Sequence, residues 1–242
     1  MKKTNEFGND RIKRSALLLV CLVLFLTLAS AGRSEADEPL HRKHIDMAAA
    51  LLGKMGEQSD AATMAEMIKS CKGVAIFPNI TQAGLVVGGM GGEGVVLVRG
   101  AHGKWNGPSF ASIAGGSFGL QIGVKQVGLV LVINNDDGRL VFTGGKSFKL
   151  GGDVSVAAGP VGRDVQAATD SRAQASIYSY SMSKGLFAGL ALSGSTINVN
   201  GDANKAYWGA VTSAETALSR RADDKRITPL TKALAELEKK AK

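Results

Sequence analysis

The stretch YSYSMSKGLFAGLALSG, residues 178–194, carries the pattern from which we interpret the rest of the chain. In its first half, tyrosine and methionine alternate with serine, and after an interruption larger and smaller apolar residues alternate again. Alternation with a period of two is typical of β-strands, whose successive side chains point to opposite faces. The interruption is Lys184-Gly185, and glycine supplies the unusual dihedrals of a tight turn. The stretch predicts a β-hairpin with a lysine at its turn, and it contains no obvious catalytic group.

The second strand of this hairpin is expected to continue to Ile197 and Val199. The alternation slips by one residue on the way, which predicts a bulge near Gly194.

Other apolar runs predict strands at residues 74–77, 85–87, 95–98, 117–124, 127–133 and 140–143. Pro78-Asn79 ends the first run, and the glycine-rich sequence GGMGGEG separates the second from the third. The cleanest alternation spans 117–124, whereas the uninterrupted run 127–133 predicts a strand buried on both faces. The sequence NNDDG, residues 134–138, predicts a turn after which the sheet continues.

Apolar residues at helical spacing predict helices on both sides of these strands. The first helix covers residues 40–56, and the second follows Ser59-Asp60, which can serve as its N-cap, and runs to Ser70. Residues 203–219 are helical in pattern, and Thr228-Pro229 begins a final helix as N-cap and first helical residue. This order predicts an α+β fold with a mainly antiparallel, barrel- or sandwich-like β core flanked by N-terminal and C-terminal helices.

The beginning of the chain has the pattern of a secretory signal peptide. Basic residues precede an apolar run at residues 16–28, and Ala29-Ser30-Ala31 supplies the small residues of a cleavage site. The run is shorter than the roughly 20 residues that a membrane span needs. We therefore expect an exported protein, periplasmic or extracellular, at the periphery of a membrane. An uncleaved N-terminal anchor is the alternative.

Composition bounds the remainder of the chain. The 242 residues include 31 glycines, about 13% against a typical ~7%, and their apolar neighbours indicate bulges and close approaches in β-structure. The formal net charge is +8, and removal of residues 1–31, with five basic and two acidic side chains, would leave +5, which suits an anionic surface without demanding one. Beyond the signal only Cys71 remains, and we interpret it as a buried hydrophobe. The expected organisation is a signal peptide at 1–31, a domain at 40–210 with helices at 42–70 and a β-rich core at 73–200, and a helical segment at 211–242.

Three glycine motifs match catalytic or nucleotide-binding signatures, and each lacks a required part. Residues 89–94 have the GxGxxG spacing, but a β pattern follows where a helix is needed. Residues 115–119 have the spacing of a hydrolase elbow, but all three histidines lie upstream of this serine. Gly145-Lys146-Ser147 lacks the first glycine of a phosphate-binding loop. We therefore expect no enzymatic activity and no cofactor.

The first helix opens with HRKH, residues 41–44. His41 and His44 have the spacing of helical metal ligands, but no Cys, Asp or Glu cluster accompanies them, so we interpret them as part of a solvated basic face and expect no metal site. Arg42 and Lys43 are candidates for membrane contact, provided that this helix lies on a membrane as a basic amphipathic helix rather than covering the core. Trp105 is a third candidate, with core packing as the alternative.

Isolated basic residues at strand ends and turns are candidates for binding lipid phosphates: Lys125, Lys146, Lys149, Arg163, Arg172 and Lys184. If they converge on one rim of the sheet, they form a site for phosphate-bearing head groups. Otherwise they serve ordinary solubility, and their spacing in the sequence does not decide between the two.

Several stretches together resemble the SYLF domain, a lipid-binding module. They occur in the family's order across roughly residues 45–210: CKGVAIF at 71–77, GGSFGLQIG at 115–123, GPVGR at 159–163, the opening stretch at 178–194, and residues 203–209. For eukaryotic members the resemblance implies binding to phosphoinositide-rich membranes, helped by an amphipathic N-terminal helix. Some fungal members with an added Src-homology module also bind actin. Bacterial members look like secreted or envelope-attached versions.

We expect this chain to depart from the eukaryotic type in a secretory signal, in the absence of a Src-homology module and in its alanine-rich first helix. The resulting expectation is a non-enzymatic exported protein that binds anionic phospholipid head groups at a membrane surface of the cell envelope. An envelope structural or protein-interaction module is the alternative. A protein partner is compatible with either, while nucleic acid is not expected, and neither is actin for an exported protein.

Overall fold

The computed structural model describes residues 40–58, 61–84, 87–118, 123–160, 175–183, 186–187 and 192–241, all within the unit Leu40–Lys242. The expected signal peptide at 1–31 lies outside these residues, as do the candidate lipid-binding residues Arg163, Arg172 and Lys184. Among the helices of the described residues, none has the length and apolar character needed to cross a membrane.

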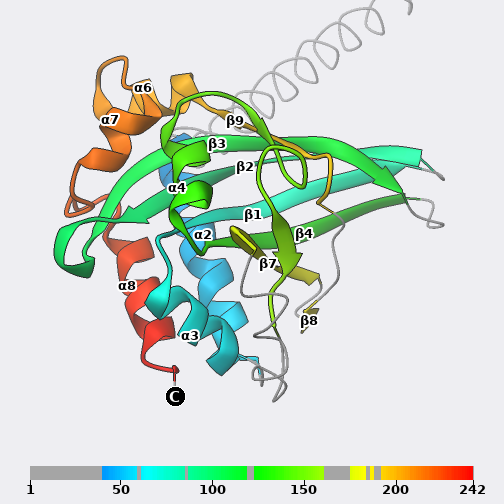
Figure 1. The fold of residues 1–242 in the computed structure, drawn as a ribbon, viewed down its shortest axis with the longest axis horizontal. Coiled ribbons are helices and arrows are strands. Elements are labelled where there is room, and N and C mark those ends of the chain that lie inside the picture. The colour runs from blue at the N-terminus through cyan, green and yellow to red at the C-terminus, as the bar shows by residue number, and fades with distance from the viewer. Residues whose placement is uncertain are drawn as a thin grey trace, which may run out of the picture. The chain divides into compact units, whose positions relative to one another are not determined.

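The described strands form one nine-stranded sheet that curls like half a barrel (Figure 1). They are β1 (Gly73–Gly84), β2 (Val87–Arg99), β3 (Trp105–Phe118), β4 (Gly123–Ile133), β5 (Phe148–Lys149), β6 (Val156–Ala158), β7 (Ile177–Ser183), β8 (Leu186–Phe187) and β9 (Thr196–Val199). Their order is β5-β9-β3-β2-β1-β4-β7-β6, with β8 paired to β7. Of these pairs only β6 and β7 run parallel. Because β4 pairs with β1 after three consecutive strands, the centre of the sheet has Greek-key order.

Helices cover both faces of this sheet. The described helices are α2 (Leu40–Gly56), α3 (Ala61–Ser70), the 3-10 helix η1 (Ala101–Gly103), α4 (Asp136–Thr143), α6 (Gly201–Trp208), α7 (Ala214–Ser219) and α8 (Thr228–Glu238). The helices α2, α3, α6 and α8 pack on one face, and α4 and α7 pack on the other. The α+β fold with a barrel-like, mainly antiparallel core is therefore confirmed.

The central strands bury their side chains on both sides. In β1, Val74 and Ile76 belong to the core under α2, α3 and α8, whereas Ala75 and Phe77 belong to the core under α4 and α7. Residues 127–133 of β4 are all buried, as the uninterrupted apolar run predicts. Each fully buried aliphatic side chain contributes about 1.5–3 kcal/mol. The stability of the sheet therefore depends on a covering layer on each face.

The helices α2 and α8 lie side by side and run in the same direction. Gly56 at the end of α2 lies against Leu237 near the end of α8, and the Lys240 ammonium donates a hydrogen bond to the Gly56 carbonyl oxygen. Leu230, Leu234 and Leu237 are all buried, as their spacing predicts. The predicted helices at 40–56, up to Ser70 and within 203–219 are also confirmed, the last as two helices.

The predicted hairpin is present, and Met182 of β7 pairs with Phe187 of β8. Residues 188–191, which follow β8, lie outside the described part of the chain. The strand β9, which was expected to continue from it, pairs instead with β3 and β5 across the sheet. Gly194 has a φ of 86° and lies in a turn rather than a bulge. The slip in alternation thus marks the passage to another part of the sheet.

Residues 136–143 form helix α4, so the turn and strand predicted there are wrong. The side chain of Asn135 accepts a hydrogen bond from the backbone N–H of Gly138 at 3.0 Å, and Asp136 and Asp137 occupy the first turn. Asn and Asp favour turns, but they also favour the start of a helix, where they satisfy free N–H groups and complement the helix dipole.

The strand β1 continues to Gly84 instead of ending at Pro78. Phe77 pairs with Leu129 and Ile80 with Val127, so two residues of β1 oppose one of β4. Proline is tolerated at such a bulge because no ladder hydrogen bond is required of it there. The glycine run GGMGGEG is likewise part of a strand, β2, and does not separate two.

The single strand predicted at 117–124 is also wrong. The strand β3 ends at Phe118, and β4 begins at Gly123 on the other side of the β1–β2 pair. The alternation therefore spans the end of one strand and the start of another.

The bulge of β1 predicts which glycine of β2 is irreplaceable. A Cβ at Gly94 would lie 2.6 Å from the Phe77 ring and would also collide with the Ile76 carbonyl oxygen. We expect Gly94→Ala to lower the free energy of unfolding by about 1–3 kcal/mol, because backbone must move to admit the methyl group. Urea denaturation measures this. In the control Gly116→Ala, the added Cβ meets no atom within 4 Å, and a change above about 0.5 kcal/mol there would contradict the explanation.

Candidate functional site

One end of the molecule brings together the first turns of α2, the helix α6 and the segment that leads into α8. We call residues 41–46, 201–208 and 220–226 together the α2–α6 corner. Its centre is Tyr207, whose ring meets the His41 ring edge-on at 5.4 Å between centroids. Phe110 of β3 completes the cluster, with its ring centroid 5.7 Å from that of Tyr207. Only 2% of Tyr207 is exposed to solvent.

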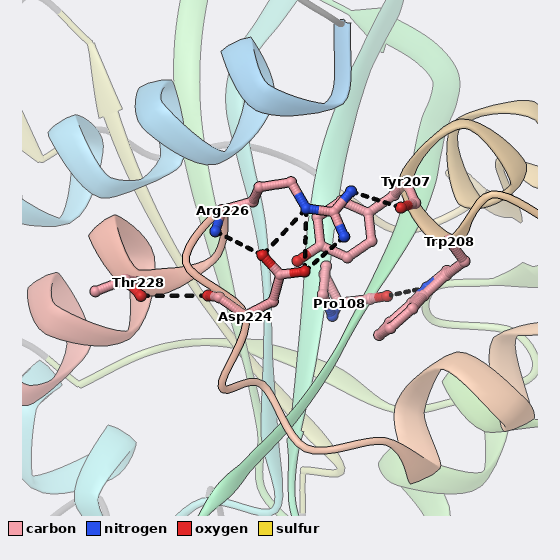
Figure 2. A network of polar contacts seen from close by, with 6 residues as sticks. All are labelled: Pro108, Tyr207, Trp208, Asp224, Arg226 and Thr228. Carbon is pink, nitrogen blue, oxygen red and sulfur yellow. Dashed lines mark hydrogen bonds and ion pairs between the residues drawn. The ribbon is translucent and has the colours of Figure 1, made fainter.

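Arg226 ties the chain before α8 to α6 (Figure 2). Its guanidinium donates to both carboxylate oxygens of Asp224, the shortest bond being 2.6 Å, and Nη1 donates to the Tyr207 carbonyl oxygen at 2.7 Å. The same guanidinium lies 4.0 Å from the centroid of the Tyr207 ring. Hydrogen bonds from Arg226 lower the pKa of Asp224. Bidentate pairs of this kind fix geometry as well as charge.

Side chains of α6 also anchor it to β3. Asn204, which is fully buried, accepts a hydrogen bond from the Phe110 N–H at 2.9 Å and donates one to the Ser109 hydroxyl at 3.2 Å. Trp208 donates its indole N–H to the Pro108 carbonyl oxygen at 3.1 Å (Figure 2). These hydrogen bonds fix α6 to β3 and thereby hold the corner against the sheet.

The two histidines of α2 are not a solvated basic face, so that interpretation is wrong. Only 7% of His41 is exposed, and His44 lies 3.3 Å from the carboxylate of Glu93 on β2. Glu93 in turn accepts a hydrogen bond from the Asn200 amide. Burial lowers the pKa of both imidazoles; for His41 the nearby Arg226 adds to this, and for His44 the Glu93 carboxylate opposes it.

Two buried polar atoms of the corner have no hydrogen-bond partner: Nδ1 of His41 and the hydroxyl oxygen of Tyr207. Burial, and secondarily the Asp224 carboxylate, raises the pKa of Tyr207 to about 12. Such unsatisfied groups each cost about 1–3 kcal/mol, so this part of the fold is held by packing at the expense of hydrogen bonding.

The corner is strongly basic. It contains seven lysine and arginine residues and four aspartates. The basic residues are Arg42, Lys43, Lys205, Arg220, Arg221, Lys225 and Arg226, all exposed. Ion pairs join Arg42 to Asp46, Arg221 to Asp223 and Arg226 to Asp224. Within the described residues the three lysines make no ion pair, so their charges face solvent.

The expected membrane-contact residues all lie at or beside this corner. Arg42 and Lys43 are exposed on the first turn of α2. Trp105 is half-buried against the core, and its carbonyl oxygen accepts a hydrogen bond from the N–H of Ala222. The Arg99 guanidinium lies 3.6 Å from the centroid of the Trp105 ring. Trp105 therefore has the packing role given above as the alternative, and its contact with a membrane stays a prediction.

The expected lipid-binding lysines lie elsewhere, and the sheet separates two of them. Lys125 is exposed on β4 and Lys149 on β5, with β9, β3, β2 and β1 between them in strand order. Lys146 is exposed between α4 and β5. Arg163, Arg172 and Lys184 belong to the residues that the structure does not describe, so their convergence stays a prediction.

The apolar side of α2 is not available at the surface. Ile45, Ala48, Leu52 and Met55 are at most 1% exposed and pack against the sheet and α8. Of the two interpretations of this helix, covering the core is the one that the structure confirms. While the helix remains in place, a membrane can meet only its exposed residues, among them Arg42 and Lys43 on the first turn.

A second surface, around α4, is richer in carboxylates, although it also includes Arg139, and Asp136 pairs with Lys72 at 3.8 Å. Leu140 is 64% exposed and lies between two open grooves of about 430 and 460 Å³. The carboxylates that line these grooves belong to Asp136, Asp137, Asp153 and Glu215. Because α4 covers the face of the sheet opposite α2, charge is distributed unequally between the two faces.

Among the described residues, no group of three or more His, Cys, Asp or Glu side chains could hold a metal ion. Cys71 is buried, and burial raises its pKa to about 11, which leaves it a protonated, unreactive thiol at neutral pH. The arrangement is suited to binding through charge.

From the sequence, Tyr207 and Trp208 were placed only within the helical stretch 203–219, and the roles of Asn204 and Arg226 were missed. The sequence RRADDKR at 220–226 offered a clue, because its adjacent acidic and basic residues permit the local pair of Asp224 and Arg226. That Arg226 would lie on the Tyr207 ring depends on tertiary packing.

Comparisons with known proteins agree with this binding character. The family model Ysc84, described as Las17-binding protein actin regulator, matches residues 114–237. The chain is 36% identical over 165 residues to LAS seventeen-binding protein 3 of Saccharomyces cerevisiae, which is 67% of this chain and 36% of that protein. It is 36% identical over 149 residues to SH3 domain-containing YSC84-like protein 1 of Homo sapiens, covering 62% of this chain and 43% of the relative.

The yeast relative is named as a binding protein, the family model is described as an actin regulator, and neither these nor the human relative's name denotes an enzyme. The chain belongs to the Ysc84, or SYLF, family, as the resemblance predicts. It spans less than half the length of these curated relatives.

Removal of Arg226 tests how the corner is held. We expect Arg226→Gln to lower the free energy of unfolding by about 1–3 kcal/mol, because it leaves the Asp224 carboxylate and the Tyr207 carbonyl without their donor. Arg226→Lys should rescue little, since an ammonium cannot form the bidentate pair. Chemical denaturation measures both, with Lys225→Gln as the control on the neighbouring exposed cation. If Arg226→Gln and Lys225→Gln lowered the free energy of unfolding equally, the contacts of Arg226 with Asp224 and the Tyr207 carbonyl would not stabilise the corner.

Proposed function

We propose that this chain is a non-enzymatic exported protein that binds anionic phospholipid head groups at a membrane surface of the cell envelope. The observation that carries this proposal is the excess of positive charge at the α2–α6 corner. Three segments contribute seven exposed lysine and arginine residues there, against four aspartates. Basic clusters of this size are attracted to anionic lipid surfaces, with about 1 kcal/mol for each lysine or arginine near the surface.

The rigidity of the corner supports the proposal. Asn204, Trp208 and Arg226 fix α6 and the 220–226 segment to β3 and to each other. The basic residues therefore start from a fixed backbone arrangement, which reduces the entropy lost on binding. The signal-like pattern of residues 1–31 supports export.

Charge reversal tests the proposal. The triple variant Lys43→Glu, Lys205→Glu, Lys225→Glu should lower partitioning onto phosphatidylglycerol vesicles by about 100-fold or more, because three favourable charges become repulsive. Co-sedimentation at low and physiological ionic strength measures this, and neutral phosphatidylcholine vesicles should retain little of either protein.

The matched variant reverses Lys125, Lys146 and Lys149, so its net charge is identical. If this variant loses binding and the corner variant keeps it, the lipid site lies on the sheet rim and not at the corner. Partitioning that is equal on neutral and anionic vesicles and independent of salt would refute an electrostatic membrane site altogether.

Protein binding is a second candidate function, supported by the grooves around α4. Leu140 is one of the few large hydrophobic side chains exposed in the described residues, and the yeast relative carries a name that specifies a binding partner. Capture of one stoichiometric partner by the wild-type protein, lost in Leu140→Ser and retained in the corner variant, would favour this function.

A further inference from the structure

His41 occupies a position in which a positive charge would be poorly tolerated. Its ring lies between those of Tyr207 and Phe110, with centroid distances of 5.4 and 6.3 Å, and only 7% of the residue is exposed. Its Nδ1 has no partner. If the ring were protonated, the N–H at Nδ1 would lose its hydration without gaining an acceptor.

The charged groups around His41 do not offset this cost. From the segment before α8, Arg226 faces it with a positive charge, and the carboxylate of Asp224 is already paired with that guanidinium. From α2 itself, His44 acts in the same direction as Arg226. From α6 and β3, the neighbouring groups are the neutral rings of Tyr207 and Phe110.

His44 differs, because Glu93 on β2 lies 3.3 Å away and favours its protonated form. The effect of burial on the pKa of His44 is larger than this attraction, and the positive charge of Lys43 acts in the same direction as burial. The pKa of His44 is therefore still lowered. The two histidines therefore act in the same direction, with His41 the more sensitive because it has no carboxylate of its own.

We propose that His41 is an acid-sensitive latch, which holds the first turns of α2 on the sheet at neutral pH and releases them to an anionic membrane surface at mildly acidic pH. This inference rests on the proposed function, which it extends to regulation of the same corner. Released turns would expose Ile45, Phe110 and Tyr207 beside Arg42 and Lys43. An apolar surface next to cations is the combination with which amphipathic segments enter a bilayer interface.

The direction of the pH dependence follows from proton linkage. Because the pKa of His41 is lowered in the folded protein, the open form binds more protons than the closed form once the pH falls below the ordinary value of about 6.5. The closed form is fully favoured above that value and loses its advantage as the pH falls toward the lowered pKa. Each histidine that takes up a proton on opening can change the opening equilibrium by up to about 10-fold per pH unit.

The experiment uses the intact protein and compares wild type with His41→Phe, which keeps a ring between Phe110 and Tyr207 but cannot be protonated. Partitioning onto phosphatidylglycerol vesicles is measured between pH 7.5 and 5.5. Wild-type binding should rise at least about 5-fold over this range, and the rise should be largely absent in His41→Phe. His102→Asn is the control, because His102 is exposed with a φ of 58° that asparagine also adopts.

Hydrogen exchange of the amides in the second turn of α2, corrected for intrinsic rates, reports opening independently of lipid. Their protection should decrease as the pH is lowered in wild type and in His102→Asn, and much less in His41→Phe, where only His44 still contributes. The same pH response in wild type and His41→Phe would overturn the latch. If wild type binds anionic vesicles at no pH while its exchange still responds to His41, the latch stands and the proposed function fails.

Discussion

The constraint on which this structure depends is the burial of both faces of one curved sheet. A strand such as β4, apolar from residue 127 to 133, can be stable only if each face is covered. Helices from both ends of the described chain supply one cover, and α4 and α7 supply the other. Glycines then become necessary wherever two layers or a bulge approach closely, as Gly94 does beside Phe77. The high glycine content is thus a consequence of dense packing on both sides.

The α2–α6 corner shows how such a fold can also provide a binding surface. Its interior is aromatic and tightly packed around Tyr207, and its exterior is basic. Arg226 connects the two, since its guanidinium contacts the buried ring on one side and pairs with the half-buried Asp224. The polar atoms left without partners, on His41 and Tyr207, are a cost that packing alone offsets. The backbone under this basic surface is thus fixed by packing, while a buried imidazole whose charge depends on pH, that of His41, lies directly beneath it.

Much of the fold could be predicted from the sequence, because periodicity reports which faces are buried. The α2 helix, the buried strand at 127–133 and the β7–β8 hairpin follow from local pattern. Where local signals have two meanings, prediction failed: Asn135 with its neighbouring aspartates indicates a turn and equally caps α4.

The candidate site was harder to predict from the sequence, because it is made by contacts between segments that are distant in the chain. Arg42 and Lys43 could be named from their place on a basic helix. That the chain around Arg226 would lie beside them depends on the path of the whole sheet. The burial of His41 could not be predicted either, because a histidine among basic residues is expected to be solvated. It is the packing of Tyr207 from α6 against the His41 ring that buries it.

The parallel packing of α2 against α8 also has a consequence for when the protein can finish folding. The first described helix is covered by the last, and the contact of Gly56 with Leu237 joins residues that are far apart in the chain. Contacts of such long range slow folding, because a large loop must close before they form. During synthesis the apolar side of α2 cannot be sealed until α8 has been made. The nascent chain therefore remains incompletely folded until residues 228–238 have been synthesised, because only then can α8 cover the apolar side of α2.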